Sequence, residues 1–334
     1  MILVFPAAIM SSIAAVRSHQ VQRMILICSI YEIDRLARVE LRQLEYFIAV
    51  ASEMNFSRAA QRVHVVQSAL STSVGKLEKE LGVELFDRSK QQIKITPAGE
   101  LFREHARRVI QTARLARDSM SDFRGELTGT VDLGSLISHG RLDVPKVLGE
   151  FHQNHPLVQI RLRQSQTGST AYLSAIVDGS LDLALVSSPT RFPPRIAMHL
   201  LSEEPMMFVC RPDHHLSSRN TVSLKDLADE DLIGFPLEFG LRRLVEDAFT
   251  ANGITARTPY EVALEYSVAA DLVRHGLGSI FMPASEASRV PDLRAVNVRP
   301  VVMWRIYLAS AEQLGPASAR LAEMLLASAG GAPA

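Results

Sequence analysis

The hydrophobic positions of residues 40–97 predict three short helices followed by a small hairpin. In the first helix the apolar side chains recur at helical spacing, and they are Leu41, Leu44, Phe47, Ile48 and Ala51. The pattern breaks after Met54, and Ser57 is expected to be the N-cap of a second, short helix. A third helix is expected from about Ser68 to Leu81, where Gly82 ends it.

The third helix has one apolar and one polar face. The apolar face consists of Leu70, Val74, Leu77 and Leu81. The polar face consists of Gln67, Ser68, Ser71, Thr72, Gly75, Lys76 and Lys79. Short polar side chains at the start of such a helix suit base edges and phosphates in a major groove. In the hairpin that follows, Ile93 and Ile95 alternate as a strand, and Arg88, Lys90 and Lys94 add positive charge.

A long helix is expected from Pro97 to about Arg124, with Thr96 as its cap. Its apolar residues repeat at alternating spacings of four and three, and they are Phe102, Ala106, Val109, Ala113, Ala116, Met120 and Phe123. Because this is the repeat of a coiled coil, the helix is predicted to pair with the same helix of a second chain. The alternative is a helix that packs on its own C-terminal domain.

Beyond Gly129 the pattern changes to alternating strands and helices. Strands are expected at 130–135, 158–162, 181–187, 206–210, 278–283 and 303–310. Helices are expected at 141–154, 172–178, 241–252, 268–275 and 316–327. This alternation predicts two α/β lobes, each with a largely parallel sheet that helices cover on both faces.

Composition supports two or three globular domains and gives no electrostatic argument for nucleic acid. The 334 residues are 47% hydrophobic and 22% charged, with a formal net charge of zero. Any attraction to phosphate must therefore come from the placement of charges. Cys28 and Cys210 lie far apart and match no metal-binding spacing, which favours a reduced protein in the cytoplasm with no disulfide, metal or cofactor.

Residues 1–38 form an N-terminal extension with three possible interpretations. The apolar stretch at 1–16 is shorter than the roughly 18 residues that span a bilayer, and it lacks the positive start of a signal peptide. We expect this extension to be a start-site artefact, with translation beginning at Val39. A membrane anchor and a real extension are the alternatives, and we expect no membrane partner.

The chain resembles the LysR-type transcriptional regulators. The resemblance rests on Leu41-Arg-Gln-Leu-Glu-Tyr-Phe, Phe56-Ser-Arg-Ala-Ala, Gln67-Ser-Ala-Leu-Ser, Leu77-Glu-Lys-Glu-Leu-Gly, Leu85-Phe-Asp-Arg and Thr96-Pro-Ala-Gly, and further on Asp178-Gly-Ser-Leu-Asp-Leu-Ala, Leu272-Val-Arg-His-Gly-Leu-Gly-Ser and Met282-Pro. It implies an α+β multidomain protein. The implied parts are an all-α winged helix-turn-helix (40–97), a linker and dimerisation helix (98–125) and a periplasmic-binding-protein-like (type 2) α/β effector domain (129–330). Its first lobe would comprise about 129–203 and 306–330, and its second about 204–305.

The resemblance also implies which residues touch DNA. Four would face the major groove, namely Gln67, Ser68, Ser71 and Thr72. The residues expected at the phosphate backbone are Ser57, Lys76, Arg88 and Lys90. The chain departs from the family at Ser68, where proline is usual, and at Thr72, where a cation is common. The loss of that cation puts a guanine contact at 72 in doubt. For the lysines, a solvated surface is the alternative.

A ligand is expected between the two lobes, where strands end and helices begin. Free N–H groups at such positions suit an organic anion. The residues named for this site are Ser135, Ser138, Thr167, Gly168, Ser169, Phe235, Phe239 and Ser279. The alternative is that the Ser and Thr residues are ordinary helix caps and that the two phenylalanines belong to the core.

The predicted function is a homodimeric or homotetrameric regulator that binds promoter DNA, responds to a small-molecule effector and contacts RNA polymerase. The alternatives are a solute-binding receptor that uses the two-lobed domain, and a regulator that needs no ligand. Catalysis is not expected. In Ser138-His139 and in Asp213-His214-His215, adjacent side chains should point apart, and no third metal ligand is expected.

Overall fold

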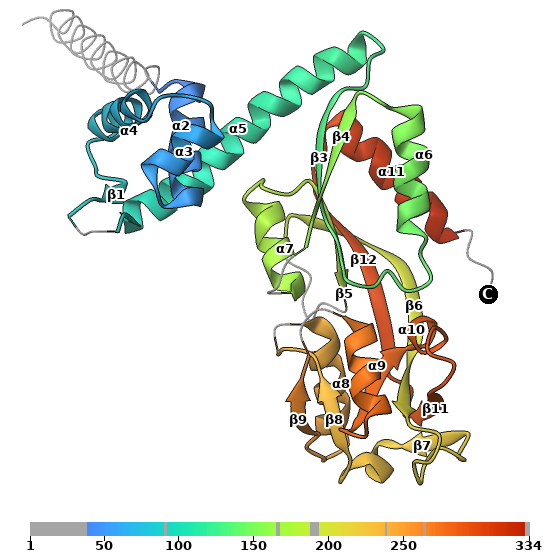
Figure 1. Cartoon of the computed structure of the whole chain (residues 1–334). Coiled ribbons are helices and arrows are strands. Elements are labelled where there is room, and N and C mark those ends of the chain that lie inside the picture. The colour runs from blue at the N-terminus through green and yellow to red at the C-terminus, as the bar shows by residue number, and fades with distance from the viewer. Residues whose placement is uncertain are drawn as a thin grey trace, which may run out of the picture. The chain divides into compact units, whose positions relative to one another are not determined.

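The computed structural model describes residues 39–89, 92–164, 168–187, 194–237, 239–262 and 265–330 (Figure 1). The expectations for residues 1–38, Lys90 and Thr167 lie outside the described residues. Among the described helices, none combines the length and the apolar character that crossing a membrane requires. The described residues form two compact units, which divide between Ile110 and Gln111, inside one long helix.

The first unit contains the three short helices and the hairpin that the hydrophobic pattern predicts. Its elements are α2 (Leu41–Glu53), α3 (Phe56–Arg62), α4 (Gln67–Leu81), β1 (Phe86–Asp87), β2 (Lys94–Ile95) and the start of α5 (Pro97–Phe123). The side chains of Phe47, Leu70, Val74 and Leu77 are fully buried between the helices. The ring of Phe47 lies 5.4 Å from that of Phe86, so the hairpin shares the helical core.

One helix cap differs from the prediction. Asn55, not Ser57, is the N-cap of α3, because its side chain accepts hydrogen bonds from the backbone N–H groups of Ser57 (2.9 Å) and Arg58 (3.0 Å). Asn55 has the extended backbone typical of a cap, whereas Ser57 is already the second helical residue. Thr96 caps α5 as predicted, since its hydroxyl accepts from the N–H of Gly99 at 3.0 Å.

The second unit has two α/β lobes. The first lobe contains β3 (Gly129–Gly134), α6 (Val144–Asn154), β4 (Val158–Arg163), α7 (Gly168–Val177), β5 (Leu183–Ser187), β12 (Met303–Ala311) and α11 (Pro316–Gly330). The second contains β7 (Thr221–Ser223), the 3-10 helix η1 (Leu224–Leu227), β8 (Asp231–Gly234), α8 (Gly240–Ala251), β9 (Arg257–Glu261), α9 (Tyr266–Arg274), β10 (Ser279–Pro283), α10 (Ala284–Ala287) and β11 (Arg294–Arg299).

A single strand, β6 (Ile196–Cys210), runs through both lobes (Figure 1). Its first part pairs with β12, up to Pro205 opposite Met303. From Met206 onward it pairs with β10. Within each lobe the sheet is parallel where predicted, since β3 pairs with β4 and β5, and β8 pairs with β9 and β10. The sequence pattern identified only 206–210, because the first part of β6 is mostly polar or half-exposed.

The helix α5 packs in two ways along its length. Within the first unit, Phe102 and Ala106 join the helical core. Within the second unit, Arg114 lies 4.0 Å from the carboxylate of Asp132. The predicted apolar repeat is nevertheless largely exposed in the single chain, with Met120 59% and Phe123 88% accessible. The C-terminal half of α5 therefore contacts its own domain and still presents an apolar stripe.

Candidate functional site

The polar face of α4 is exposed, as the sequence predicts. Gln67, Ser68, Thr72 and Lys76 are exposed and Ser71 is half-buried. On the opposite face of the same helix three leucine and valine side chains, Leu70, Val74 and Leu77, have no accessible surface. This burial holds the helix in place, so its polar side is available to a partner along its whole length.

The start of α4 is tied to the start of α3. The hydroxyl of Ser57 donates a hydrogen bond to Oε1 of Gln67 at 3.1 Å. The carbonyl of the Gln67 side chain is thereby used within the protein, and its amide group keeps two donors for an outside acceptor. Two residues predicted separately for DNA contact are thus coupled, and Ser57 helps to orient Gln67.

The predicted backbone contact Arg88 is held by partners that the sequence pattern did not indicate. Its guanidinium lies 2.6 Å from Oε2 of Glu78 and 4.9 Å from the ring centre of Phe56. The other oxygen of Glu78 accepts hydrogen bonds from the N–H groups of Leu85 and Phe86. Glu78 therefore fixes the hairpin against α4, and the exposed side of Arg88 points outward in one defined orientation.

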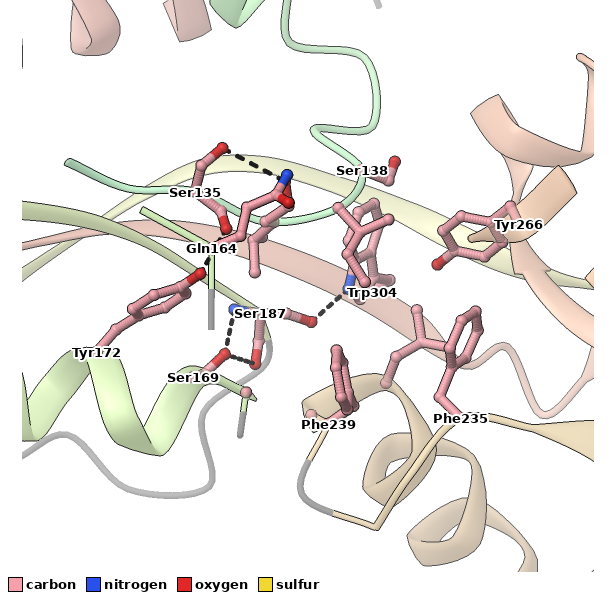
Figure 2. A pocket seen from close by; sticks show the side chains of 15 residues that line it. Ser135, Ser138, Gln164, Ser169, Tyr172, Ser187, Phe235, Phe239, Tyr266 and Trp304 are labelled. Carbon is pink, nitrogen blue, oxygen red and sulfur yellow. Dashed lines mark hydrogen bonds between the residues drawn. The ribbon is translucent and has the colours of Figure 1, made fainter. Parts of the chain in front are cut away.

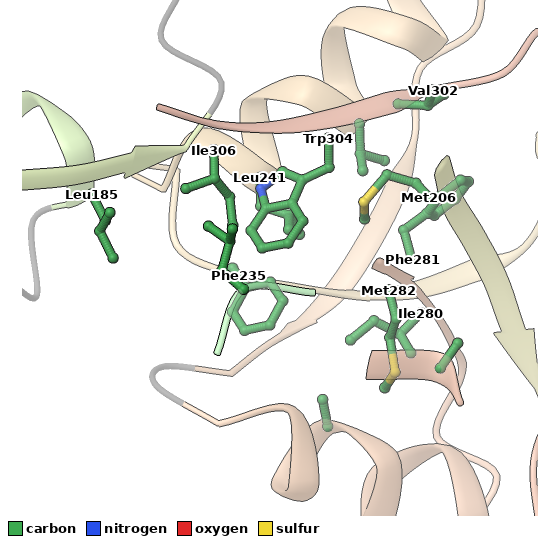
Figure 3. Close-up of a cluster of buried hydrophobic side chains, with 14 of the residues drawn as sticks. Leu185, Met206, Phe235, Leu241, Ile280, Phe281, Met282, Val302, Trp304 and Ile306 are labelled. Carbon is green, nitrogen blue, oxygen red and sulfur yellow. The ribbon is translucent and has the colours of Figure 1, made fainter. Parts of the chain in front are cut away.

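A cavity lies between the two lobes of the second unit (Figure 2). It encloses about 600 Å³, its open mouth included. The lining consists of Ser135, Leu136, Ile137, Ser138, Gln164, Gly168, Ser169, Tyr172, Ser187, Phe235, Phe239, Gly240, Leu241, Tyr266 and Trp304. Within this described lining every polar side chain is uncharged. Six of the residues named from the sequence are present, and the apolar core continues behind Phe235 and Trp304 (Figure 3).

Ser279 is not among the described residues that line this cavity, so its contact with an effector stays a prediction. It is buried at the first position of β10, where it pairs with Leu232 of β8. The two strands run parallel, and β8 reaches the cavity only beyond its C-terminal end, at Phe235. Ser279 lies at the N-terminal end of β10, away from the end of β8 that Phe235 follows.

Three of the predicted serines already have hydrogen-bond partners, namely Ser138, Ser169 and Ser135, whose partner is His139. The hydroxyl of Ser138 donates to Oε1 of Glu286 at 2.5 Å and accepts from the N–H of Gly140 at 3.1 Å. Ser169 accepts from the N–H of Ser187 at 3.0 Å. Ser138 and Ser169 are therefore bonded within the cavity wall, which supports the alternative interpretation that these two serines have a structural role.

The structure adds polar groups that the sequence did not single out. The indole N–H of Trp304 donates to the hydroxyl of Ser187 at 2.5 Å. Among the described residues, the proton of that hydroxyl has no acceptor. Burial raises the pKa of Tyr266 well above its ordinary value, and the carboxylates of Glu286 and Glu204 raise it further. Its phenol thus stays protonated and can donate.

The N-terminus of α8 opens toward the cavity. Its N-cap, Phe239, provides no capping side chain, so the first N–H groups of the helix have no partner from that residue. A Cβ placed on Gly240 would lie 2.4 Å from the carbonyl oxygen of Ser187. Gly240 therefore lets the two lobes approach each other, with backbone donors at the point of approach.

His139, which was considered for catalysis, does not pair with the adjacent Ser138, as expected. His139 pairs instead with Ser135, at 2.8 Å between Nε2 and Oγ. Burial lowers the pKa of His139, and the charge of Arg289 lowers it further, so the ring is neutral at pH 7.

The expectation that adjacent histidines point apart is wrong for His214 and His215. Their ring centres are 4.5 Å apart, because these residues lie in a turn, where the alternation of a strand does not apply. A third potential metal ligand, Glu230, is also present beside them.

Both units match models of one protein family. Residues 41–100 match "Bacterial regulatory helix-turn-helix protein, lysR family", and residues 124–330 match "LysR substrate binding domain". The HTH-type transcriptional regulator ShiR of Corynebacterium glutamicum (strain R) is 36% identical over 200 residues, which are 59% of this chain and 66% of ShiR. The uncharacterized HTH-type transcriptional regulator YybE of Bacillus subtilis (strain 168) is 31% identical over 80% of this chain and 88% of YybE.

A similar solved structure is that of full-length CbnR complexed with its target DNA. It is 27% identical to this chain, has a TM-score of 0.59, and covers 87% of this chain and all of CbnR. The similarity therefore extends over the first unit and the second unit together.

Proposed function

Because the chain belongs to the LysR family of transcriptional regulators, we propose that α4 reads promoter bases and that the cavity between the lobes holds the controlling small molecule. The chain is a DNA-binding transcriptional regulator with a substrate-binding domain. The observation that carries the proposal for α4 is its exposed polar face, which three fully buried side chains hold in position.

The DNA contacts divide into two kinds. Gln67 and Ser71, with Ser68 and Thr72 beside them, read base edges in the major groove. The residues that contact phosphates are Ser57, Lys76, Arg88 and Lys90. Ser57 also orients Gln67, and Glu78 orients Arg88. Because the net charge of the chain is zero, the attraction to the DNA backbone comes from the positions of Lys76, Arg88 and Lys90.

The effector is an organic anion with an apolar ring or chain. Its apolar part packs on Phe235 and Phe239, which lie on one side of the cavity (Figure 2). Its negative group lies near the N-terminus of α8 at Gly240, where backbone N–H groups and the hydroxyl of Ser187 can donate. Ser135, Ser138, Gly168 and Ser169 line the part of the cavity that belongs to the first lobe.

The protein acts as a homodimer or homotetramer that contacts RNA polymerase in the cytoplasm and performs no catalysis. The exposed apolar stripe of α5 supports self-association, because a stripe with coiled-coil spacing is buried when two such helices pair. The Ser135–His139 pair does not support catalysis, since among the described residues no carboxylate hydrogen-bonds the second ring nitrogen of His139.

Replacing Gln67 by alanine tests the assignment of α4. The variant Gln67→Ala should lose discrimination between the promoter site and random DNA by about 1–3 kcal/mol, the value of a specific base contact. Fluorescence anisotropy with both DNAs at fixed salt measures this. Gln61→Ala is the matched control, because Gln61 is an exposed glutamine on α3 outside the polar face of α4. Equal losses on both DNAs for Gln67→Ala would refute the assignment.

A further inference from the structure

The turn after β6 brings two imidazoles and one carboxylate together. Nε2 of His214 lies 3.0 Å from one oxygen of Glu230, and Nε2 of His215 lies 3.3 Å from the other. One ligand atom from each of the three residues lies within 4.8 Å of the other two. These residues belong neither to the proposed DNA-reading face nor to the lining of the cavity.

The spacing of these atoms fits a four-coordinate metal ion. Zinc binds imidazole nitrogen and carboxylate oxygen at about 2.0–2.1 Å in a tetrahedron, which places neighbouring ligand atoms roughly 3.3 Å apart. The two nitrogen–oxygen separations, 3.0 and 3.3 Å, are close to that value, and they involve the two different oxygens of Glu230. Side-chain rotations that bring both imidazole nitrogens to one of these oxygens would form three corners of the tetrahedron, starting from ligand atoms that lie within 4.8 Å of one another.

The surroundings favour a cation and leave room for a fourth ligand. Among the described residues, no lysine or arginine forms an ion pair with Glu230, whereas Asp213 pairs with Arg211 and Asp292 with Arg274. The side chain of Glu230 is only 16% exposed, so its charge is poorly hydrated. The side chain of His215 is 68% exposed, which leaves one side of the cluster open to water.

We propose that His214, His215 and Glu230 bind one divalent transition-metal ion of the zinc type, with water as the fourth ligand. Two imidazoles and one carboxylate suit zinc and its neighbours better than magnesium or calcium, which prefer oxygen ligands alone. The ion joins the turn after β6 to the residue that precedes β8. Phe235, at the other end of β8, lines the cavity.

A hydrogen bond within the turn limits the affinity. The N–H of Leu216 points to Nδ1 of His214 at 3.3 Å, so Nε2 of that ring carries the proton and donates to Glu230. Before Nε2 can bind the ion, this proton must move to Nδ1, and Nδ1 then no longer accepts from Leu216, a contact that is long for a hydrogen bond. We therefore expect micromolar binding, weaker than that of a closed structural zinc site.

Calorimetric titration of the full-length protein with Zn²⁺ alone tests the proposal. The protein carries no histidine tag and is first dialysed against a chelator. Wild type should bind one Zn²⁺ per chain at this site, and His215→Ala and Glu230→Gln should each weaken binding at least about tenfold. His199→Ala, which removes an exposed histidine from β6, is the matched control and should bind as wild type does. Equal Zn²⁺ binding by wild type and His215→Ala, or no binding by wild type, would overturn the proposal.

A second readout separates metal binding from an ordinary hydrogen-bonded cluster. Zn²⁺ should raise the melting temperature of wild type and leave that of His215→Ala unchanged, because His215 is exposed and its removal does not disturb the core. Co²⁺ should give the visible absorption of a four-coordinate ion in wild type alone. If Zn²⁺ stabilises both proteins equally, the ion binds elsewhere and the assignment is wrong.

Discussion

Single glycines control how closely parts of this molecule approach each other. Gly240 begins α8 directly against the carbonyl of Ser187, on the other lobe, and an added methyl group would overlap that oxygen. Gly149, in the middle of α6, has no atom within 4 Å of the same position. The same substitution should therefore have opposite effects at these two sites.

We predict that Gly240→Ala destabilises the second unit by about 1–3 kcal/mol, the usual range for overpacking. Gly149→Ala should stabilise the protein by about 0.5–1 kcal/mol, since alanine is the better helix former and meets no neighbour. Urea unfolding of both variants measures the difference. A stabilising effect of Gly240→Ala would show that the lobes do not meet at this residue in solution.

Cys210 gives the protein a pH-dependent stability. Its side chain is fully buried, and burial raises its pKa from 9.0 to about 11. Below pH 9 the thiol is protonated in both the folded and the unfolded chain and contributes no difference. Between pH 9 and pH 11 the unfolded chain loses the proton first, so stability falls as the pH rises.

This predicts a pH-dependent difference between wild type and Cys210→Ala. The wild type should lose on the order of 2 kcal/mol of unfolding free energy between pH 8 and pH 11 through this group, and the variant should not. Urea unfolding at both pH values measures the free-energy gap between the two proteins. A gap that stays constant with pH would mean that the thiol is not shielded from water.

At the scale of elements, the two halves of α5 pack in different units. Its N-terminal half completes the helical core of the first unit, and its C-terminal half contacts the second unit through Arg114 and Asp132. Neither arrangement covers Met120 or Phe123. An exposed apolar stripe with this spacing is the part of the element that a second chain would bury.

We predict that Met120→Glu weakens self-association, because a carboxylate at the centre of a paired stripe would be buried without a partner. Ser119→Glu, one residue away and outside the apolar repeat, should leave the assembly unchanged. Analytical ultracentrifugation across a range of concentrations compares the two variants. If Met120→Glu associates as strongly as wild type, α5 is not the dimer contact.

At the scale of the whole molecule, a ligand can control DNA binding only if it binds one relative arrangement of the two lobes more tightly than another. Among the described residues, the chain passes from one lobe to the other in β6 and in the short connection before Met303, and the cavity takes residues from both lobes. A ligand that bridges the cavity therefore has a direct means of favouring one arrangement. Such a ligand also stabilises the folded protein in proportion to its occupancy.

A panel of aromatic and alicyclic carboxylic acids should contain compounds that raise the melting temperature of the full-length protein. At a concentration 100 times its Kd, a ligand adds about 2.7 kcal/mol. Phe239→Ala should remove the shift, because Phe239 is part of the apolar wall, whereas Phe123→Ala, on α5, should retain it. The absence of any shift across the panel would favour a regulator that needs no ligand.

The sequence by itself determined those features that depend on neighbours in the chain. The positions of α2 to α5, the cap at Thr96 and the buried stripe of α4 follow from helical spacing and local hydrogen bonding, and the structure agrees with them. The βαβ alternation predicts the lobes for the same reason. The N-cap at Asn55 was missed although it is local, since Asn55 and Ser57 are both good caps.

Tertiary structure decided which polar groups are free and which are already bonded. Ser138 looked available to a ligand, but its proton belongs to Glu286, 148 residues away. Trp304 and Ser187 meet in the cavity across a similar separation, and Glu230 reaches two histidines from a different element. Hydrogen bonds between distant segments have no period in the sequence, because they depend on which surfaces the folded chain brings together.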